Sequence, residues 1–115
     1  MAAASGIAKI ISNLPEANHY FAVAEGLTHA IGNNTISGGW TLASADTVLW
    51  GGANPVIQNT SGATRTANVI SVFTGTQALA SDLLCHISHT GVTLNDQESV
   101  EYTSIEISHA TDDIT

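Results

Sequence analysis

Hydrophobic and polar residues alternate with a period of two along most of the chain, and one segment near the start has the longer period of a helix. Its large apolar residues fall at i, i+3, i+4 and i+7, namely Ile7, Ile10, Ile11 and Leu14. Ser5 stands where an N-cap belongs, and Pro15 ends the run. We therefore predict a helix within a helical N-terminal segment, residues 1–15. Its apolar face should pack either on its own domain or on a neighbouring subunit.

After Pro15 the pattern changes to short strands separated by turn residues. Strands are predicted at residues 19–25, 40–42, 48–50, 56–58, 66–74, 81–89, 92–94, 100–102 and 105–107. The segment that contains Gly32-Asn33-Asn34 and Ser37-Gly38-Gly39 is expected to form a loop. Residues 66–74 are apolar on both faces, which indicates a central strand between layers.

This series of strands and turns predicts a mainly β fold. The expected architecture is an antiparallel β-sandwich, of jelly-roll or Ig-like type, or a small barrel, with a short N-terminal helix. A chain of 115 residues is long enough for one hydrophobic core and short for two. We therefore expect a single β-sandwich domain over residues 1–115, with residues 109–115 as a flexible acidic tail.

Charged residues are few and unbalanced. Two basic residues, Lys9 and Arg65, stand against ten acidic ones, so the net charge at pH 7 is -8, and charged residues make up only 10% of the chain. Nucleic-acid backbones and anionic membrane surfaces are bound through several Lys or Arg side chains. We therefore expect neither nucleic acid nor a membrane as a partner, and a surface whose polarity comes mainly from Ser, Thr and Asn.

The stretch SDLLCHISH, residues 81–89, holds the one cysteine of the chain and two of its five histidines. In a strand, Cys85 and His89 point to one face and His86 to the other, whereas a zinc site needs three or four convergent ligands. Cys85 also lies between two apolar residues of its own face, as a small buried side chain does. We interpret the stretch as a strand and predict no metal and no cofactor.

The chain offers no recognisable catalytic motif. It has no G-x-S-x-G elbow, and Gly38-Gly39 and Gly51-Gly52 are not followed by the Lys or the helix start of a phosphate loop. The adjacent carboxylates Asp112 and Asp113 lie in the tail, where a catalytic pair could not be held rigid. We predict no catalytic residues and a non-enzymatic protein.

The aromatic residues leave two interpretations open. Trp50 ends an apolar strand and is expected in the core, whereas Trp40, beside two glycines, is expected either in the core or at an interface. The candidate assembly contacts are Ile7, Ile10, Ile11, Leu14 and Trp40. If the chain instead binds a carbohydrate, the candidates are Trp40, Tyr20 and Tyr102 for stacking and Asn33 and Asn34 for hydrogen bonds.

Six segments together carry a resemblance to a known family. They are AKIISNLP at 8–15, HYFAVAEG at 19–26, VLWGGANPVIQNTSGAT at 48–64, NVISVFTG at 68–75, SDLLCHIS at 81–88 and VTLNDQESVEYTSIEIS at 92–108. In this order they resemble small virion structural proteins of tailed bacteriophages, of the capsid decoration, cement or fibre type. Residues 27–47 depart from that pattern, and Gln97-Glu98 stand in place of its Gly-Asp.

The resemblance implies a non-enzymatic capsid decoration or cement protein that self-associates, with a trimer favoured, and stabilises a shell. Its partner would be the major capsid protein or another virion protein, and its place would be the capsid exterior or the tail. The alternative is a fibre or tail-associated module that binds a receptor or a carbohydrate.

Overall fold

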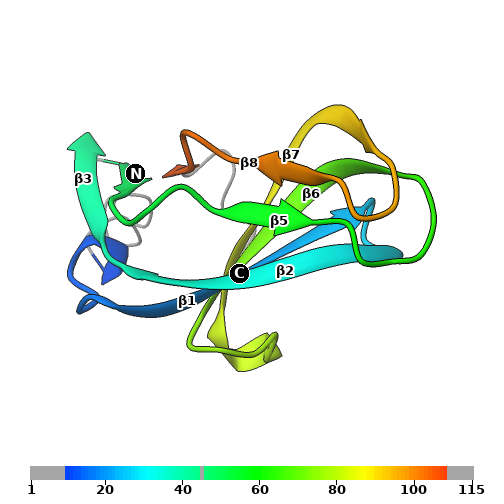
Figure 1. Cartoon of the computed structure of the whole chain (residues 1–115). Helices are drawn as coiled ribbons and strands as arrows, with labels where there is room; N and C mark the ends of the chain where they lie inside the picture. The colour runs from blue at the N-terminus through cyan, green and yellow to red at the C-terminus, as the bar shows by residue number, and fades with distance from the viewer. Residues whose placement is uncertain (1–9, 45, 109–115) are drawn as a thin grey trace.

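The computed structural model describes residues 10–44 and 46–108, and these residues form a mainly β fold of antiparallel sheets (Figure 1). One sheet has four strands in the order β2-β1-β6-β7, a second has the order β3-β4-β9, and β5 and β8 pair as a two-stranded ribbon. The predicted mainly β class with antiparallel sheets is confirmed, and the arrangement is sandwich-like.

The strands have the bounds β1 Ala17–Glu25, β2 His29–Gly38, β3 Trp40–Ser44, β4 Thr47–Trp50, β5 Val56–Gln58, β6 Arg65–Thr74, β7 Leu83–Leu94, β8 Ser99–Glu101 and β9 Glu106–Ser108. Residues 10–12 are helical, and a 3-10 turn, η1, covers Ala80–Asp82.

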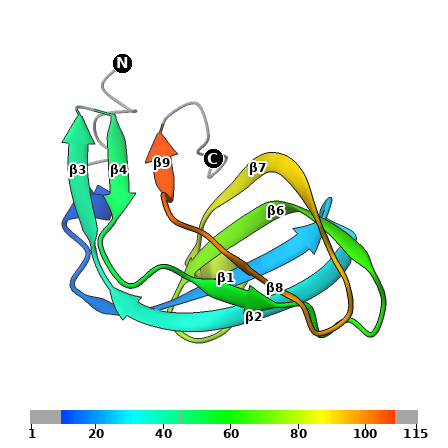
Figure 2. The ribbon, with the colours of Figure 1, turned by 45° about the horizontal axis from the view of Figure 1, so that its top comes forward.

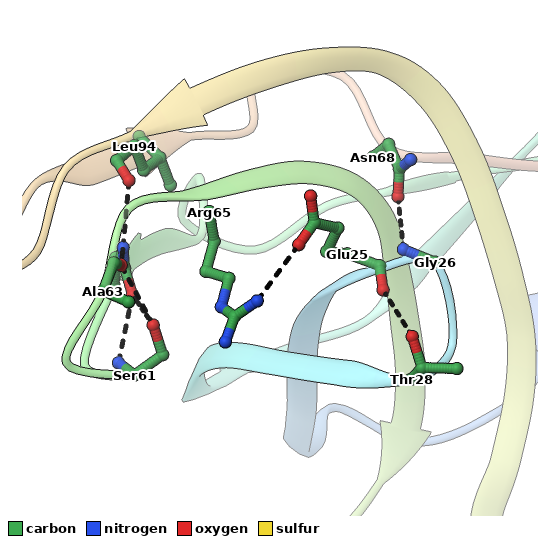
Figure 3. A network of polar contacts seen from close by, with 9 residues as sticks. Glu25, Gly26, Thr28, Ser61, Ala63, Arg65, Asn68 and Leu94 are labelled. Carbon is green, nitrogen blue, oxygen red and sulfur yellow. Dashed lines mark hydrogen bonds and ion pairs between the residues drawn. The ribbon is translucent and has the colours of Figure 1, made fainter.

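The loop expected at residues 32–39 is wrong, because most of that segment forms β2, paired along its length with β1. Gly32 is not a turn residue. It is required because the backbone carbonyl of Gln58 lies where its Cβ would stand. The true turn is at residues 26–28, where Gly26 has a φ of 59°, a conformation that glycine adopts without steric cost. The Gly26 N–H donates to Asn68 Oδ1 at 2.7 Å (Figure 3).

The chain leaves the four-stranded sheet at Gly39 and enters the second sheet, as Figure 2 shows in the passage from β2 to β3. Segment β4–β5 then returns, and segment β8–β9 pairs with it. The β5-β8 ribbon contacts both edge strands of the four-stranded sheet, β2 through β5 and β7 through β8. The Thr60 N–H donates to the Ile31 carbonyl at 2.9 Å and fastens one side of this contact. Both edges of the large sheet are thereby partly covered.

The core lies between the four-stranded sheet and the strands that cross it. Its fully buried side chains are drawn from both layers and include Phe21, Val23, Ile31, Val48, Ile57, Ile70, Val72, Cys85 and Ile107. Strand β6 lies between β1 and β7 and is buried on both faces, so the predicted central strand is confirmed. Full burial of one Val, Ile or Phe side chain contributes about 1.5–3 kcal/mol to folding.

The buried side-chain amide of Asn59 joins the loop after β5 to the end of β7. Asn59 donates its side-chain N–H groups to the carbonyls of Ala63 at 2.8 Å, Leu94 at 3.0 Å and Asn95 at 3.2 Å, and its Oδ1 accepts from Ser61. Figure 3 draws the bonds that end at Ser61, Ala63 and Leu94. Every polar atom of this fully buried side chain is hydrogen-bonded, and these bonds compensate for the hydration that is lost on burial. Asn59 thus fixes the turn that follows β5.

The described end of the predicted N-terminal helix packs on the chain itself. Ile11 lies in the core cluster and Leu14 packs against that cluster, whereas Ile10 is 67% exposed. Ile7 and the tail, residues 109–115, lie outside the described residues. No helix formed by the described residues is long and apolar enough to cross a membrane.

Candidate functional site

The most completely buried polar side chain of the aromatic region is His19, on β1. It is only 1% exposed, and both of its ring nitrogens are hydrogen-bonded. Nε2 lies 3.0 Å from the indole Nε1 of Trp40 on β3, and Nδ1 lies 3.0 Å from the carbonyl oxygen of Ala17. The pair therefore joins the four-stranded sheet to the second sheet.

The partners fix the protonation of the His19 ring. An indole N–H only donates and a carbonyl only accepts, so Nε2 must accept from Trp40 and Nδ1 must carry the proton that goes to Ala17. The imidazole is neutral in this arrangement. Burial lowers the pKa of His19 below its ordinary value of 6.5, and the bond to the Ala17 carbonyl opposes that change.

Two further aromatic rings surround this pair. Trp50 on β4 packs edge-on against His19, Trp40 and Phe21, with ring centroids 4.8, 5.2 and 5.1 Å away respectively. The Trp50 indole donates to the carbonyl of Ala53 at 2.9 Å. Edge-on contacts of this kind are favourable beyond the area that they bury. The expectation that Trp50 belongs to the core agrees with this packing.

A second histidine joins the four-stranded sheet to the segment between β8 and β9. His89 on β7 has Nε2 2.9 Å from the hydroxyl of Tyr102 and Nδ1 2.8 Å from the carbonyl oxygen of Thr90. The register between β6 and β7 shifts here, so that residues 89–91 lie opposite Asn68 alone. This bulge turns His89 toward the segment that joins β8 to β9.

The His89–Tyr102 pair borders a hollow of about 350 Å³. Its apolar walls are Ile70, Ile87 and Ile105, and Ser104 and Glu106 add polar atoms. Partial burial raises the pKa of Tyr102 to about 12. In the neutral imidazole Nδ1 donates to the Thr90 carbonyl, so Nε2 accepts from the Tyr102 hydroxyl. The two polar groups best placed to fix a ligand are therefore already bonded to each other.

The remaining residues of SDLLCHISH do not converge. Cys85 is fully buried in the core, and His86 points to the other face, where its Nδ1 lies 2.6 Å from the hydroxyl of Ser71 on β6. Ser71 and His86 are direct cross-strand neighbours, so we interpret the bond as one that satisfies a buried hydroxyl. Within residues 10–44 and 46–108, no three His, Cys, Asp or Glu side chains are grouped as a metal ion requires.

The residues named for carbohydrate binding are divided among four places. Tyr20 and Asn33 line a second hollow, of about 420 Å³, together with Ser71. Tyr102 belongs to the first hollow, and Asn34 donates to the carbonyl of Val56 at 3.0 Å. Trp40, with 6% exposure, is in the core.

The candidate assembly contacts are likewise divided. Ile11 and Trp40 are buried within the chain itself, whereas Ile10 is exposed. A buried side chain reaches a partner only if the fold opens, so of the described candidates Ile10 is the one that presents a free apolar surface. Leu42 on the neighbouring sheet, which sequence reasoning did not select, is also 42% exposed. Leu42 lies in an edge strand, and an edge strand can be recognised only when the order of the strands in the sheet is known.

Comparison of the chain with protein-family models, with curated proteins and with solved structures finds no match. The fold is an antiparallel, sandwich-like β fold, and within its described residues His19, His86 and His89 are hydrogen-bonded to other groups of the chain.

Proposed function

We propose that the protein is a non-enzymatic assembly protein, a virion structural component of the capsid decoration or cement type that self-associates and stabilises a shell. The order of sequence elements supports the virion role. The observation that supports self-association is the strand β3, an edge of the second sheet whose last four residues are exposed and uncharged. Its partners would be further copies of this chain, with a trimer favoured, and the major capsid protein or another virion protein.

The edge strand β3 has neither the charged residue nor the proline that often protects an edge from pairing, and its one irregularity is a register shift against β4 between Leu42 and Ser44. Exposed edges in monomeric proteins commonly carry Lys, Pro or a bulge that prevents another strand from adding to the sheet. Residues 41–44 are Thr, Leu, Ala and Ser, and within the described part of the chain β3 pairs only with β4. A closed symmetric oligomer would repeat the same contact in each subunit and present many weak shell contacts at once.

A charge placed on this edge tests the proposal. We expect the wild-type chain to be oligomeric by size-exclusion chromatography with light scattering, and Leu42→Lys to shift it toward the monomer. Leu27→Lys is the matched control, because Leu27 is 70% exposed but lies in the turn between β1 and β2, away from the edge. A monomeric wild type at every soluble concentration, or equal behaviour of the two variants, would contradict self-association through β3.

The alternative function, binding of a carbohydrate by a fibre or tail-associated module, is supported by the shared hollow of Tyr20 and Asn33. An aromatic ring beside an amide is a combination that sugar sites use. A glycan array with the wild type and Asn33→Ala tests it, with Asn54→Ala as the control, because Asn54 is exposed and bonded to Glu101 instead. Absence of any saccharide preference in the wild type would leave the assembly role alone.

A further inference from the structure

We propose that the His19–Trp40 pair is an acid-sensitive joint between the two sheets: when the His19 imidazole gains a second proton, the Trp40 indole is released and the β3 end of the second sheet loosens. The inference concerns a conformational response of the fold and does not depend on the assembly role.

The response follows from the hydrogen-bonding capacity of the two side chains. A protonated imidazole donates from both nitrogens, and an indole has a donor and no acceptor. The Trp40 N–H and the new Nε2–H would then face each other at a site where 3.0 Å now separates the nitrogens. Nδ1 keeps its bond to Ala17 in either state, so Trp40 is the group that must move.

The surroundings offer the second proton little compensation. The strand partners of His19 are Ile36 on β2 and Thr74 on β6, and neither is charged. Two acidic residues approach this region: Glu16, whose Cγ lies near Gly39, and Asp82, whose carboxylate lies near Gly75. Both lie beside neighbours of the pair and not against the ring, so an imidazolium here would be buried and poorly paired.

The opening should be local. Strand β3 is an edge with β4 as its strand neighbour, so releasing Trp40 requires few other bonds to break. The His89–Tyr102 pair tolerates acid, because the Tyr102 hydroxyl can rotate and accept from a protonated His89. The sheets would therefore stay attached on the His89 side while the β3 end loosens.

The two tryptophans of the chain both lie in this cluster, so intrinsic fluorescence reports on it directly. We expect the emission of the wild type to shift to longer wavelength as the pH falls from about 7.5 to about 5. Over the same interval the NMR signal of the Trp40 indole N–H should exchange faster, in step with the titration of the His19 ring. The Tyr102–His89 contact should persist.

The variant His19→Gln separates protonation from packing. An amide oxygen near the place of Nε2 accepts from Trp40 and does not titrate, so the acid shift should disappear. His29→Gln is the matched control, because His29 is exposed on β2, and this variant should respond as the wild type does. The proposal is overturned if His19→Gln keeps the full acid shift. If that variant does not fold, the wild type decides: an indole N–H that stays protected after His19 has titrated overturns it equally.

Discussion

The His19–Trp40 and His89–Tyr102 pairs share one hydrogen-bond scheme but differ in burial and in the donor. In each pair Nδ1 donates to a backbone carbonyl and Nε2 accepts from an aromatic side chain of the other layer. His19 is fully buried among aromatic rings, whereas His89 is partly exposed beside an open hollow. The indole can only donate, but the phenol can donate or accept.

We therefore expect the hydrogen-bonding partner of each histidine to set how its site responds to pH. Two bonds of nearly equal length, 3.0 and 2.9 Å, need not behave alike when a proton is added. The His19–Trp40 bond can form only while the His19 imidazole is neutral. The second can reverse its donor and acceptor, and it fails only when the phenol itself loses its proton.

The largest effect should come from removing each imidazole. In His19→Ala the Trp40 indole loses its acceptor and a cavity opens beside Trp50, so we expect a loss of roughly 3–5 kcal/mol in the free energy of unfolding. In His89→Ala water can reach the hollow, and we expect about 1 kcal/mol or less. Urea denaturation at pH 7.5 measures both. Equal losses would contradict the contrast in burial.

A smaller effect should follow when only the donor is deleted. Trp40→Phe keeps an aromatic ring but leaves the buried Nε2 of His19 unsatisfied, which we expect to cost about 1–3 kcal/mol, with some further loss from the smaller ring. Tyr102→Phe removes one hydroxyl from a partly exposed bond, with an expected cost of about 0.5–1.5 kcal/mol. Thermal unfolding of the two variants beside the wild type compares them, and the reverse order would show that the second pair is the stronger joint.

The strands on both sides of the His19–Trp40 pair could be predicted from local periodicity, but the pair could not. Residues 19–25 and 40–42 follow the alternation that a strand requires, and β1 and β3 occupy them. The pair depends on β2, which was predicted as a loop because Gly32, Asn33 and Asn34 are residues typical of turns. Once β2 runs antiparallel to β1, Ala17 lies opposite Gly38, and Trp40 must come back near His19.

The His89–Tyr102 pair could not be predicted for a different reason. A strict period of two places His89 on the face of Cys85, and the bulge at residues 89–91 breaks that period without a clear mark in the sequence. Gln97, noted in place of a glycine, has a φ of 73°. This left-handed conformation was not predicted, because Gln is not a residue that usually adopts it.

Acid should destabilise the fold through His19. Because the folded pKa of His19 is lowered below 6.5, the unfolded chain binds the proton first. Stability is then complete above pH 6.5 and falls with pH until the folded-state pKa is reached. The loss is about 1.4 kcal/mol for each unit by which the pKa is lowered. Urea midpoints of the wild type and His19→Gln between pH 7.5 and 4.5 should diverge toward acid, and parallel curves would remove His19 as the cause.

Alkali should act on the other pair, with the smallest effect because Tyr102 is partly exposed. Its pKa is raised from 10.0 to about 12, so the unfolded chain loses the phenolic proton first. The contribution is present below pH 10 and is lost as the pH rises toward 12. The phenolate has no proton to donate, so the bond to the Nε2 acceptor of His89 is lost. Tyr102→Phe should remove this part of the alkaline loss, whereas Tyr20→Phe should leave it in place, and urea midpoints from pH 9 to 11.5 measure the difference. If Tyr102→Phe loses stability in alkali as steeply as Tyr20→Phe does, the phenol is not the alkaline counterpart of His19.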